Sequence, residues 1–187
     1  VNGNAKGTVQ DAAGKLQIGL GIWGDLDLEG TLKDSSYQVQ IVGQNILVSQ
    51  LAKDSSMQSL KTIGFHAQLT GAGFKVWESA QIQLSGNIDS LVWDNAIFRD
   101  ISLEGEVYGK RFKGKLVSTD KRAAINATVA GDFETAIPIL DLDINLHCVD
   151  LRSFGWASRP THLCGRMVSH SEGLSLDTLK ANVRIEK

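Results

Sequence analysis

The sequence has little proline, no long hydrophobic run and no excess of either charge. Two Pro stand against 19 Gly in 187 residues, a ratio that fits neither collagen nor a flexible linker. No stretch approaches the roughly 20 consecutive apolar residues that a membrane-spanning helix requires. Because 19 Lys and Arg balance 21 Asp and Glu, the net charge is -2, which argues against nucleic-acid binding through a general basic surface.

Motifs for catalysis and for nucleotide binding are also missing. No Ser stands in a nucleophile-elbow motif, and no Gly-rich loop is followed by Lys and Ser or Thr. The segment Gly71-Ala72-Gly73 joins predicted strands and opens no helix, so we interpret it as a turn. We therefore expect a protein that is not an enzyme and needs no cofactor.

Metal ligands are sparse. His66 and His147 fall on the predicted solvent-facing sides of separate strands, and His147 next to Cys148 is a weak pair because strand neighbours point to opposite faces. Asp141 and Asp143 alternate with Leu, which predicts an outward face and not a calcium loop. We expect no metal site.

The two cysteines, Cys148 and Cys164, leave two alternatives open. Their spacing suits a disulfide between adjacent strands in an oxidising compartment, and it equally suits two small buried thiols, which we slightly favour. The chain starts Val1-Asn2-Gly3, in the middle of a strand-like pattern. We expect residues 1–187 to be a single internal segment of a longer protein.

Alternation of apolar and polar residues dominates the chain. This period of two is typical of strands with one buried and one solvated face. The clearest run has Leu140, Leu142, Ile144 and Leu146 on one side, with acidic and polar residues opposite. The chain is therefore predicted to be all-β and antiparallel, with on the order of a dozen strands. Helical spacing occurs only near residues 45–53, with a second, shorter turn at 151–154.

A recurring tripeptide of the form apolar-x-Gly closes one predicted strand after another. Each Gly falls two residues after an apolar residue and so lies on the apolar face. Such a Gly can simply end a strand, or, repeated in one phase, it can bend a whole sheet along a line. We favour the bend. The glycines concerned are Gly30, Gly71, Gly86, Gly105, Gly131 and Gly165.

The order of several short pieces resembles one protein family. Ile101-Ser102-Leu103-Glu104-Gly105 is followed by Arg111-Phe112-Lys113-Gly114 and then by Asp150-Leu151-Arg152-Ser153-Phe154. Flanking pieces at 50–56 and 172–179 are also similar. Each piece is degenerate, but their order resembles the TamB (translocation and assembly module) family within the AsmA-like group.

The resemblance implies an elongated sheet that is rolled into an open trough, a β-taco, with a hydrophobic interior. It implies a periplasmic segment of an inner-membrane-anchored protein in a Gram-negative envelope. Its partners would be phospholipid or other acyl chains and, through other parts of the parent protein, an outer-membrane assembly machinery such as a TamA or BamA-like barrel. The implied function is phospholipid transport between the membranes, linked to outer-membrane protein assembly.

Alternation identifies the residues that would line the trough. The same pattern fits a closed, dry sandwich core, an alternative that we consider less favoured. Two other functions stay open: chaperone-like pairing of an exposed edge with strands of outer-membrane proteins, and a purely structural β-domain. The four Trp residues, Trp23, Trp77, Trp93 and Trp156, could rim the groove or pack in a core. The predicted lining residues are Leu26, Leu28, Ile82, Leu84, Ile101, Leu103, Ile125, Val129, Leu142 and Ile144.

Overall fold

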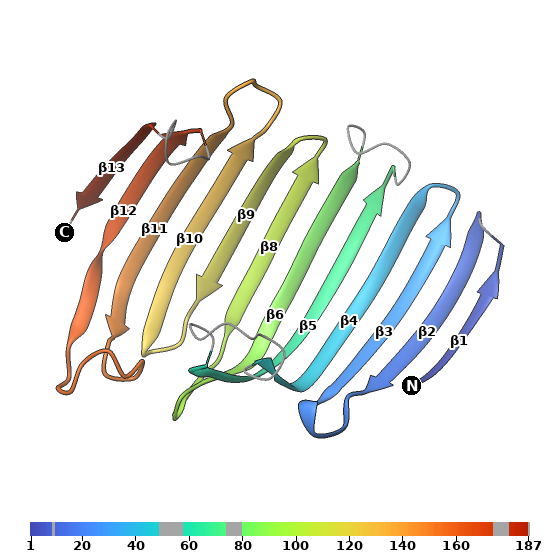
Figure 1. Cartoon of the computed structure of the whole chain (residues 1–187), viewed down its shortest axis with the longest axis horizontal. Helices are drawn as coiled ribbons and strands as arrows, with labels where there is room; N and C mark the ends of the chain where they lie inside the picture. The colour runs from blue at the N-terminus through green and yellow to red at the C-terminus, as the bar shows by residue number, and fades with distance from the viewer. Residues whose placement is uncertain (9, 49–57, 74–79, 174–179, 187) are drawn as a thin grey trace.

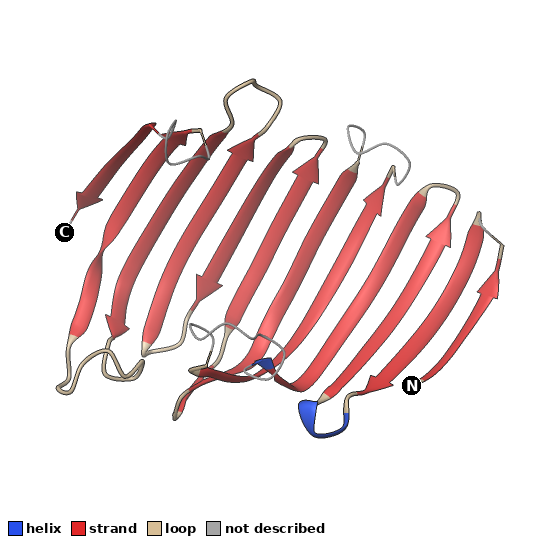
Figure 2. Ribbon diagram, in the orientation of Figure 1, coloured by secondary structure: helices blue, strands red, loops and turns tan. Residues whose placement is uncertain are grey.

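A computed structural model describes residues 1–8, 10–48, 58–73, 80–173 and 180–186. In these ranges the chain forms one antiparallel sheet of thirteen strands (Figures 1 and 2). The strands are β1 (Asn2–Gly7), β2 (Asp11–Gly19), β3 (Asp25–Lys33), β4 (Ser36–Leu47), β5 (Leu60–Ala72), β6 (Gln81–Trp93), β7 (Ala96–Phe98), β8 (Ile101–Tyr108), β9 (Arg111–Ser118), β10 (Ala123–Asp132), β11 (Ile139–Asp150), β12 (His162–Glu172) and β13 (Lys180–Glu186).

The sheet is an open meander in which each strand pairs with the next along the chain. The exception is the short strand β7, which pairs only with the end of β6, while β6 pairs onward with β8. Strands β1 and β13 form the two edges (Figure 1). The predicted all-β class and antiparallel pairing are confirmed. Because all described strands belong to one sheet, the alternative of a two-sheet sandwich does not apply to them.

Tight turns at several strand ends account for the meander. Lys33 pairs with Ser36 and Tyr108 with Arg111, so Asp34-Ser35 and Gly109-Lys110 are two-residue hairpin tips. Asp34 has φ 56 and Gly109 has φ 56. Left-handed backbone at the first tip residue suits such turns, and Asp and Gly adopt it more readily than most residues. The sequence Tyr108-Gly109-Lys110-Arg111 predicts a tight hairpin with Lys110 at its tip, and the pairing of Tyr108 with Arg111 confirms it.

The helix predictions are largely wrong in the described part of the chain. Residues 45–47 of the predicted helix at 45–53 belong to β4, Val48 is helical, and 49–53 lie outside the described residues. Residues 151–155 form turns held by Asp150, whose carboxylate accepts hydrogen bonds from the Arg152 backbone and the Ser153 hydroxyl. A three-residue 3-10 helix, η1 (Gly21–Trp23), connects β2 to β3.

The packed core is small and lies at one end of the sheet. Phe98, Ile101 and Ala123 are buried at its centre, and parts of β6, β8, β9, β10 and the β11–β12 loop pack around them. Phe98 is 2% exposed. Most other apolar residues are only half-buried. In a single sheet, a side chain contacts the backbone and its neighbours on the same face, but no second layer packs over it.

Candidate functional site: the apolar face of the sheet

Strand register assembles the apolar residues into four rows that cross the sheet. Partners directly opposite each other in antiparallel strands share a face, so a row can be followed from strand to strand. Each row is named after one member. The Leu103 row runs through Gly3, Leu16, Leu28, Ile41, Ala67, Gly86, Leu103, Leu116, Ala127, Ile144, Met167 and Ile185.

Two further rows lie on one side of the Leu103 row, and one lies on the other. The Leu142 row comprises Ala5, Gly14, Gly30, Val39, Leu69, Leu84, Gly105, Gly114, Val129, Leu142, Ser169 and Val183. Beyond it, the Leu140 row comprises Gly7, Ala12, Leu32, Tyr37, Gly71, Ile82, Val107, Phe112, Gly131, Leu140, Ser171 and Ala181. On the opposite side, the Ile101 row comprises Ile18, Leu26, Gly43, Phe65, Ile88, Ile101, Ser118, Ile125, Leu146 and Gly165.

We call these four rows the apolar face. Every position in them is apolar or aromatic, glycine or serine, and none is charged. The register places all ten predicted lining residues on this face. Leu28, Leu103 and Ile144 share one row, and Leu84, Val129 and Leu142 share the next. The Ile101 row holds Leu26, Ile101 and Ile125, and the Leu140 row holds Ile82.

The apolar face is an open surface over most of its area. Of the ten residues, eight are half-buried, Leu84 is 39% exposed and only Ile101, at 9% exposed, is buried. Leu16, near one edge of the sheet, is 38% exposed. Uncovered apolar surface of this kind normally marks a site for a ligand or a partner.

The glycines of the apolar face do not form the single line that the sequence predicted. Gly30 and Gly105 lie in the Leu142 row, and Gly71 and Gly131 lie in the Leu140 row. Gly86 and Gly165 lie in the other two rows. The repeat therefore marks the face but not one line across it, because the register shifts the tripeptides relative to one another.

Aromatic rings from neighbouring strands cover three of these glycines. Phe65 lies over its register partner Gly43, Tyr37 over Gly71, and Phe112 over Gly131. A Cβ atom built at Gly43 would stand 2.9 Å from Phe65 Cζ, so the ring occupies the space that a side chain would need. Gly105 differs, because its nearest neighbour to a built Cβ is Leu84 Cβ at 3.6 Å. The rings thus fill the space that a side chain would need at these three glycines.

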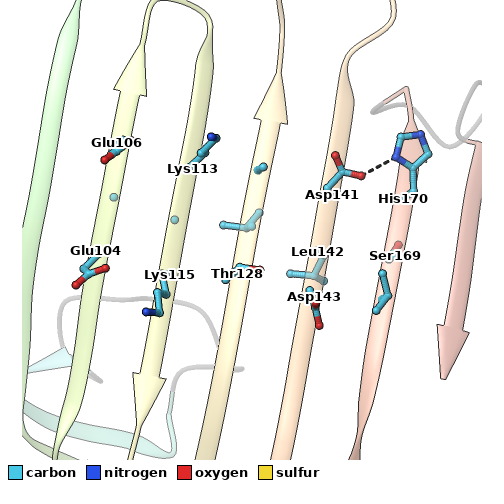
Figure 3. A pocket seen from close by; sticks show the side chains of 15 residues that line it. Glu104, Glu106, Lys113, Lys115, Thr128, Asp141, Leu142, Asp143, Ser169 and His170 are labelled. Atoms are coloured by element: carbon cyan, nitrogen blue, oxygen red, sulfur yellow. Dashed lines mark hydrogen bonds and ion pairs between the residues drawn. The ribbon is translucent and has the colours of Figure 1, made fainter. Parts of the chain in front are cut away.

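The opposite face of the sheet is polar and rich in cross-strand ion pairs. In the strand register, Glu104 lies directly opposite Lys115, and Glu106 lies opposite Lys113 (Figure 3). Lys15 Nζ lies 2.7 Å from Glu29 Oε2 on the next strand. Opposite charges directly across from each other stabilise one register over its alternatives.

Two hydrogen-bonded groups extend this pattern toward the β13 edge. The Arg166 guanidinium donates to both carboxylate oxygens of Asp143, at 3.0 and 2.7 Å. This hydrogen bond lowers the pKa of Asp143, aided by the positive charge and opposed by partial desolvation, and it raises the pKa of Arg166. His170 Nδ1 lies 2.6 Å from Asp141 Oδ1 (Figure 3).

Charged side chains on the polar face surround a shallow hollow of about 490 Å³. Glu104, Glu106, Lys113, Lys115 and His170 are among its lining residues (Figure 3). They are exposed, and their charges are matched across strands. We interpret the hollow as the space between long solvated side chains and not as a catalytic pocket.

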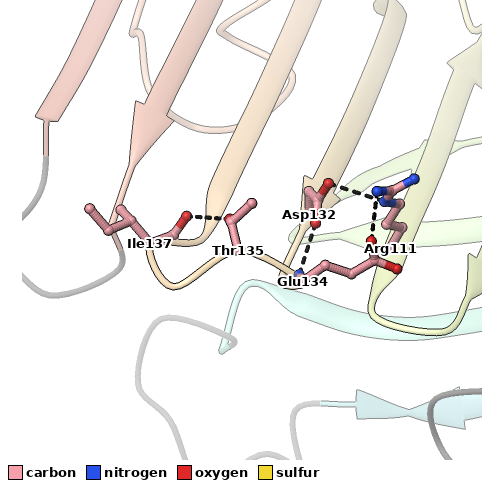
Figure 4. Close-up of polar contacts among 5 residues, drawn as sticks. All are labelled: Arg111, Asp132, Glu134, Thr135 and Ile137. Carbon is pink, nitrogen blue, oxygen red and sulfur yellow. Dashed lines mark hydrogen bonds and ion pairs between the residues drawn. The ribbon is translucent and has the colours of Figure 1, made fainter.

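The β10–β11 loop is ordered by polar contacts of the same kind. Arg111 donates to Asp132 and to Glu134, and the Glu134 backbone N–H donates to the Asp132 carboxylate (Figure 4). The Thr135 hydroxyl donates to the Ile137 carbonyl at 2.6 Å. These contacts hold the loop at the end of the sheet that carries the Leu140 row.

The cysteines form a disulfide, Cys148–Cys164, between β11 and β12. The slightly favoured alternative of two buried thiols is wrong. The pairing of the two strands shifts register between Leu146 and Val149, so Cys148 lies in an irregular stretch beside Cys164. Periodicity alone does not reveal such a shift.

His66 and His147 are exposed, as predicted. His66 Nδ1 lies 2.5 Å from Asp89 Oδ2 on the neighbouring strand. Among the described residues, no three His, Cys, Asp or Glu side chains gather in a way that could hold a metal ion. In the same residues, no helix is long and apolar enough to cross a membrane.

Comparisons of the chain with protein-family models, with curated proteins and with solved structures found no match.

Proposed function

We propose that the apolar face binds lipid acyl chains and shields them from water during phospholipid transport between two membranes. The observation that carries the proposal is the extent of this face. Its rows cross up to twelve strands without a charged residue, which at about 4.8 Å per strand spacing is roughly 50 Å. In this proposal the sheet curves into a trough with the apolar face inside.

The physical benefit of such a surface is large. Each methylene of an acyl chain that leaves water is stabilised by about 0.8 kcal/mol, so a chain of ordinary length gains on the order of 10 kcal/mol. A surface that is apolar over its whole length provides this gain at many successive positions. Lipid therefore moves along this surface without a nucleotide or a covalent step. In this proposal the segment acts as a binding module and not as an enzyme.

The proposed location is the periplasm, in a segment of a longer inner-membrane-anchored protein. The Cys148–Cys164 bond supports an oxidising compartment, because disulfides persist there and are rare in the cytosol. Contacts with an outer-membrane assembly machinery would belong to other parts of the parent protein.

A second candidate function uses the edges of the sheet. All residues of β1 and most residues of β13 are exposed, and each strand has a neighbour on one side only. Such an edge could pair with a strand of an unfolded outer-membrane protein. This alternative predicts that strand peptides bind and that lipid does not.

Photocrosslinking tests the lipid proposal. A photoreactive amino acid is placed at Leu103 or Ile144 on the apolar face, and at Glu104 or Asp143 on the polar face as matched controls one residue away. After irradiation with phospholipid vesicles, mass spectrometry should find lipid adducts at the first pair only. Equal labelling of both pairs, or labelling of neither, would overturn the proposal.

A further inference from the structure

An aromatic cluster closes one end of the apolar face. We define the aromatic cap as Trp93 at the end of β6, Phe98 in β7, and Phe154 and Trp156 in the β11–β12 loop. Phe154 stacks on Phe98 with ring centroids 4.6 Å apart and on Trp156 at 5.0 Å, and Trp93 meets Phe154 edge-on at 5.9 Å. Elements more than 50 residues apart in the chain thus meet over the sheet.

The cap lies on the Ile101 row. Three residues of this row pack in one cluster with Phe98 and Phe154. They are Ile88 on β6, Ile101 on β8 and Ile125 on β10. The contrast in exposure is sharp, since Ile101 is 9% exposed and Leu84, two rows away, is 39% exposed. Two of the ten predicted lining residues, Ile101 and Ile125, are therefore in a packed cluster and not on open surface.

Several bonds hold the two parts of the cap in place. The Cys148–Cys164 disulfide joins the two strands at the base of the β11–β12 loop, and within the loop the Leu151 N–H donates to the Thr161 carbonyl at 2.9 Å. On the other side, the Arg122 guanidinium lies 5.0 Å from the centroid of the Phe98 ring.

Asp120 anchors that arginine and the start of β8. Its buried carboxylate accepts hydrogen bonds from the Arg122 backbone N–H at 2.9 Å, from the Arg122 side chain at 3.0 and 3.1 Å and from the Arg99 backbone N–H at 3.0 Å. Burial would raise the pKa of Asp120, but these hydrogen bonds and the charge of Arg122 outweigh it, so the pKa lies below its ordinary value. The carboxylate therefore stays charged and keeps Arg122 against the ring.

We propose that the aromatic cap is a fixed end wall of the acyl-binding surface, and that the Cys148–Cys164 disulfide keeps this wall closed. Acyl chains then contact Ile144, Leu142 and Ile82 but are excluded from Ile88, Ile101 and Ile125. This inference rests on the proposed function, because it describes which part of the same face lipid can reach. The β6–β7 hairpin and the β11–β12 loop then determine how far along the strands an acyl chain can bind.

Isoleucine methyl NMR with cross-saturation from a bound fatty acid tests the inference in the intact chain, because cross-saturation reports direct contact only. The protein is deuterated except at its isoleucine methyl groups, the methylene protons of the fatty acid are irradiated, and the same experiment with the perdeuterated fatty acid is the reference. We expect loss of the Ile82 and Ile144 methyl signals and retention of those of Ile88, Ile101 and Ile125. Ile137, which is 55% exposed in the β10–β11 loop, is the control for random contact and should retain its signal.

Two variants then open the cap in different ways. Cys148→Ala/Cys164→Ala removes the covalent tie, and Phe154→Ala keeps the tie and removes the stacked ring. In each variant the Ile101 signal should be lost when the fatty acid is irradiated, whereas Ile137 should be unchanged. The two variants together keep the test informative if one of them fails to fold.

The outcomes separate the two proposals. Loss of the Ile101, Ile82 and Ile144 signals together in the unmodified protein would overturn the cap inference and leave lipid binding intact. Retention of every signal in the unmodified protein would overturn the proposed function itself. Retention of the Ile101 signal in the double cysteine variant, with its loss in Phe154→Ala, would overturn the role of the disulfide, because aromatic packing alone would then keep the wall closed.

Discussion

Adding one methyl group at two strand glycines should have opposite effects on stability. Gly131 and Gly105 both lie on the apolar face, and neither has a positive φ, so their backbones accept any residue. Alanine in a strand is favoured over glycine by about 0.5–1 kcal/mol because the unfolded glycine chain has more freedom. The surroundings of the new methyl group decide the sign of the net effect.

At Gly131 the surroundings are closed. A built Cβ would lie 2.7 Å from Phe112 Cζ and closer still to Cε1, and the Phe112 ring is itself stacked on Phe133 at 5.8 Å. Forcing an extra carbon into packed surroundings costs about 1–3 kcal/mol. At Gly105 the nearest atom is 3.6 Å away, an ordinary contact. We expect Gly105→Ala to be stabilising and Gly131→Ala to be less stable than Gly105→Ala by about 2 kcal/mol.

The free energy of unfolding of both variants is measured by urea unfolding, followed by far-ultraviolet circular dichroism. An unchanged slope m would show that the mutations alter stability and not the unfolding transition itself. The double variant Gly131→Ala/Phe112→Leu should recover part of the loss, because the shortened side chain no longer covers residue 131. Equal midpoints for Gly131→Ala and Gly105→Ala would refute the assignment of Phe112 as the cover of Gly131.

Two further predictions concern the closed end of the sheet. Asp120→Asn should lower the free energy of unfolding at neutral pH by about 1.5–3 kcal/mol, because the Arg122 and Arg99 donors lose a charged acceptor. The pKa of Asp120 is lower in the folded state, so its contribution is present above the ordinary value near 3.9 and is lost as the pH falls through the folded pKa. The difference in free energy of unfolding between the unmodified protein and Asp120→Asn should therefore shrink as the pH is lowered. A difference that stays constant over the acidic range would contradict the role of this carboxylate. Removing the disulfide with Cys148→Ala/Cys164→Ala should lower stability by roughly 3 kcal/mol, from its 16-residue separation, and a reducing agent should then have no further effect on the unfolding midpoint.

Local alternation was enough to assign residues to faces. Successive side chains of a strand point to opposite sides whatever strand lies next to it, so Leu140, Leu142 and Ile144 could be placed on one face from their spacing alone. The sequence also predicts the hairpin tip at Lys110, because Gly109 readily adopts the left-handed backbone that a two-residue turn needs. Helical spacing misled at residues 45–47, where pairing of β4 with β5 prevails over the local pattern.

Register could not be derived from the same pattern. A slip of two residues keeps every side chain on its face, so alternation does not say that Phe112 faces Gly131 or that the repeated glycines fall in different rows. The Cys148–Cys164 bond has the same origin, because it depends on a register shift between β11 and β12.

What the sequence determined by itself is an amphipathic, all-β chain with one apolar face, since that follows from contacts between a residue and its nearest neighbours along the strand. Only the tertiary structure decided which part of the face is open. The aromatic cap joins residues 93 and 98 to residues 154 and 156 through ring contacts across several strands. Such contacts depend on where two loops meet in space, and no local pattern in either loop encodes the position of the other.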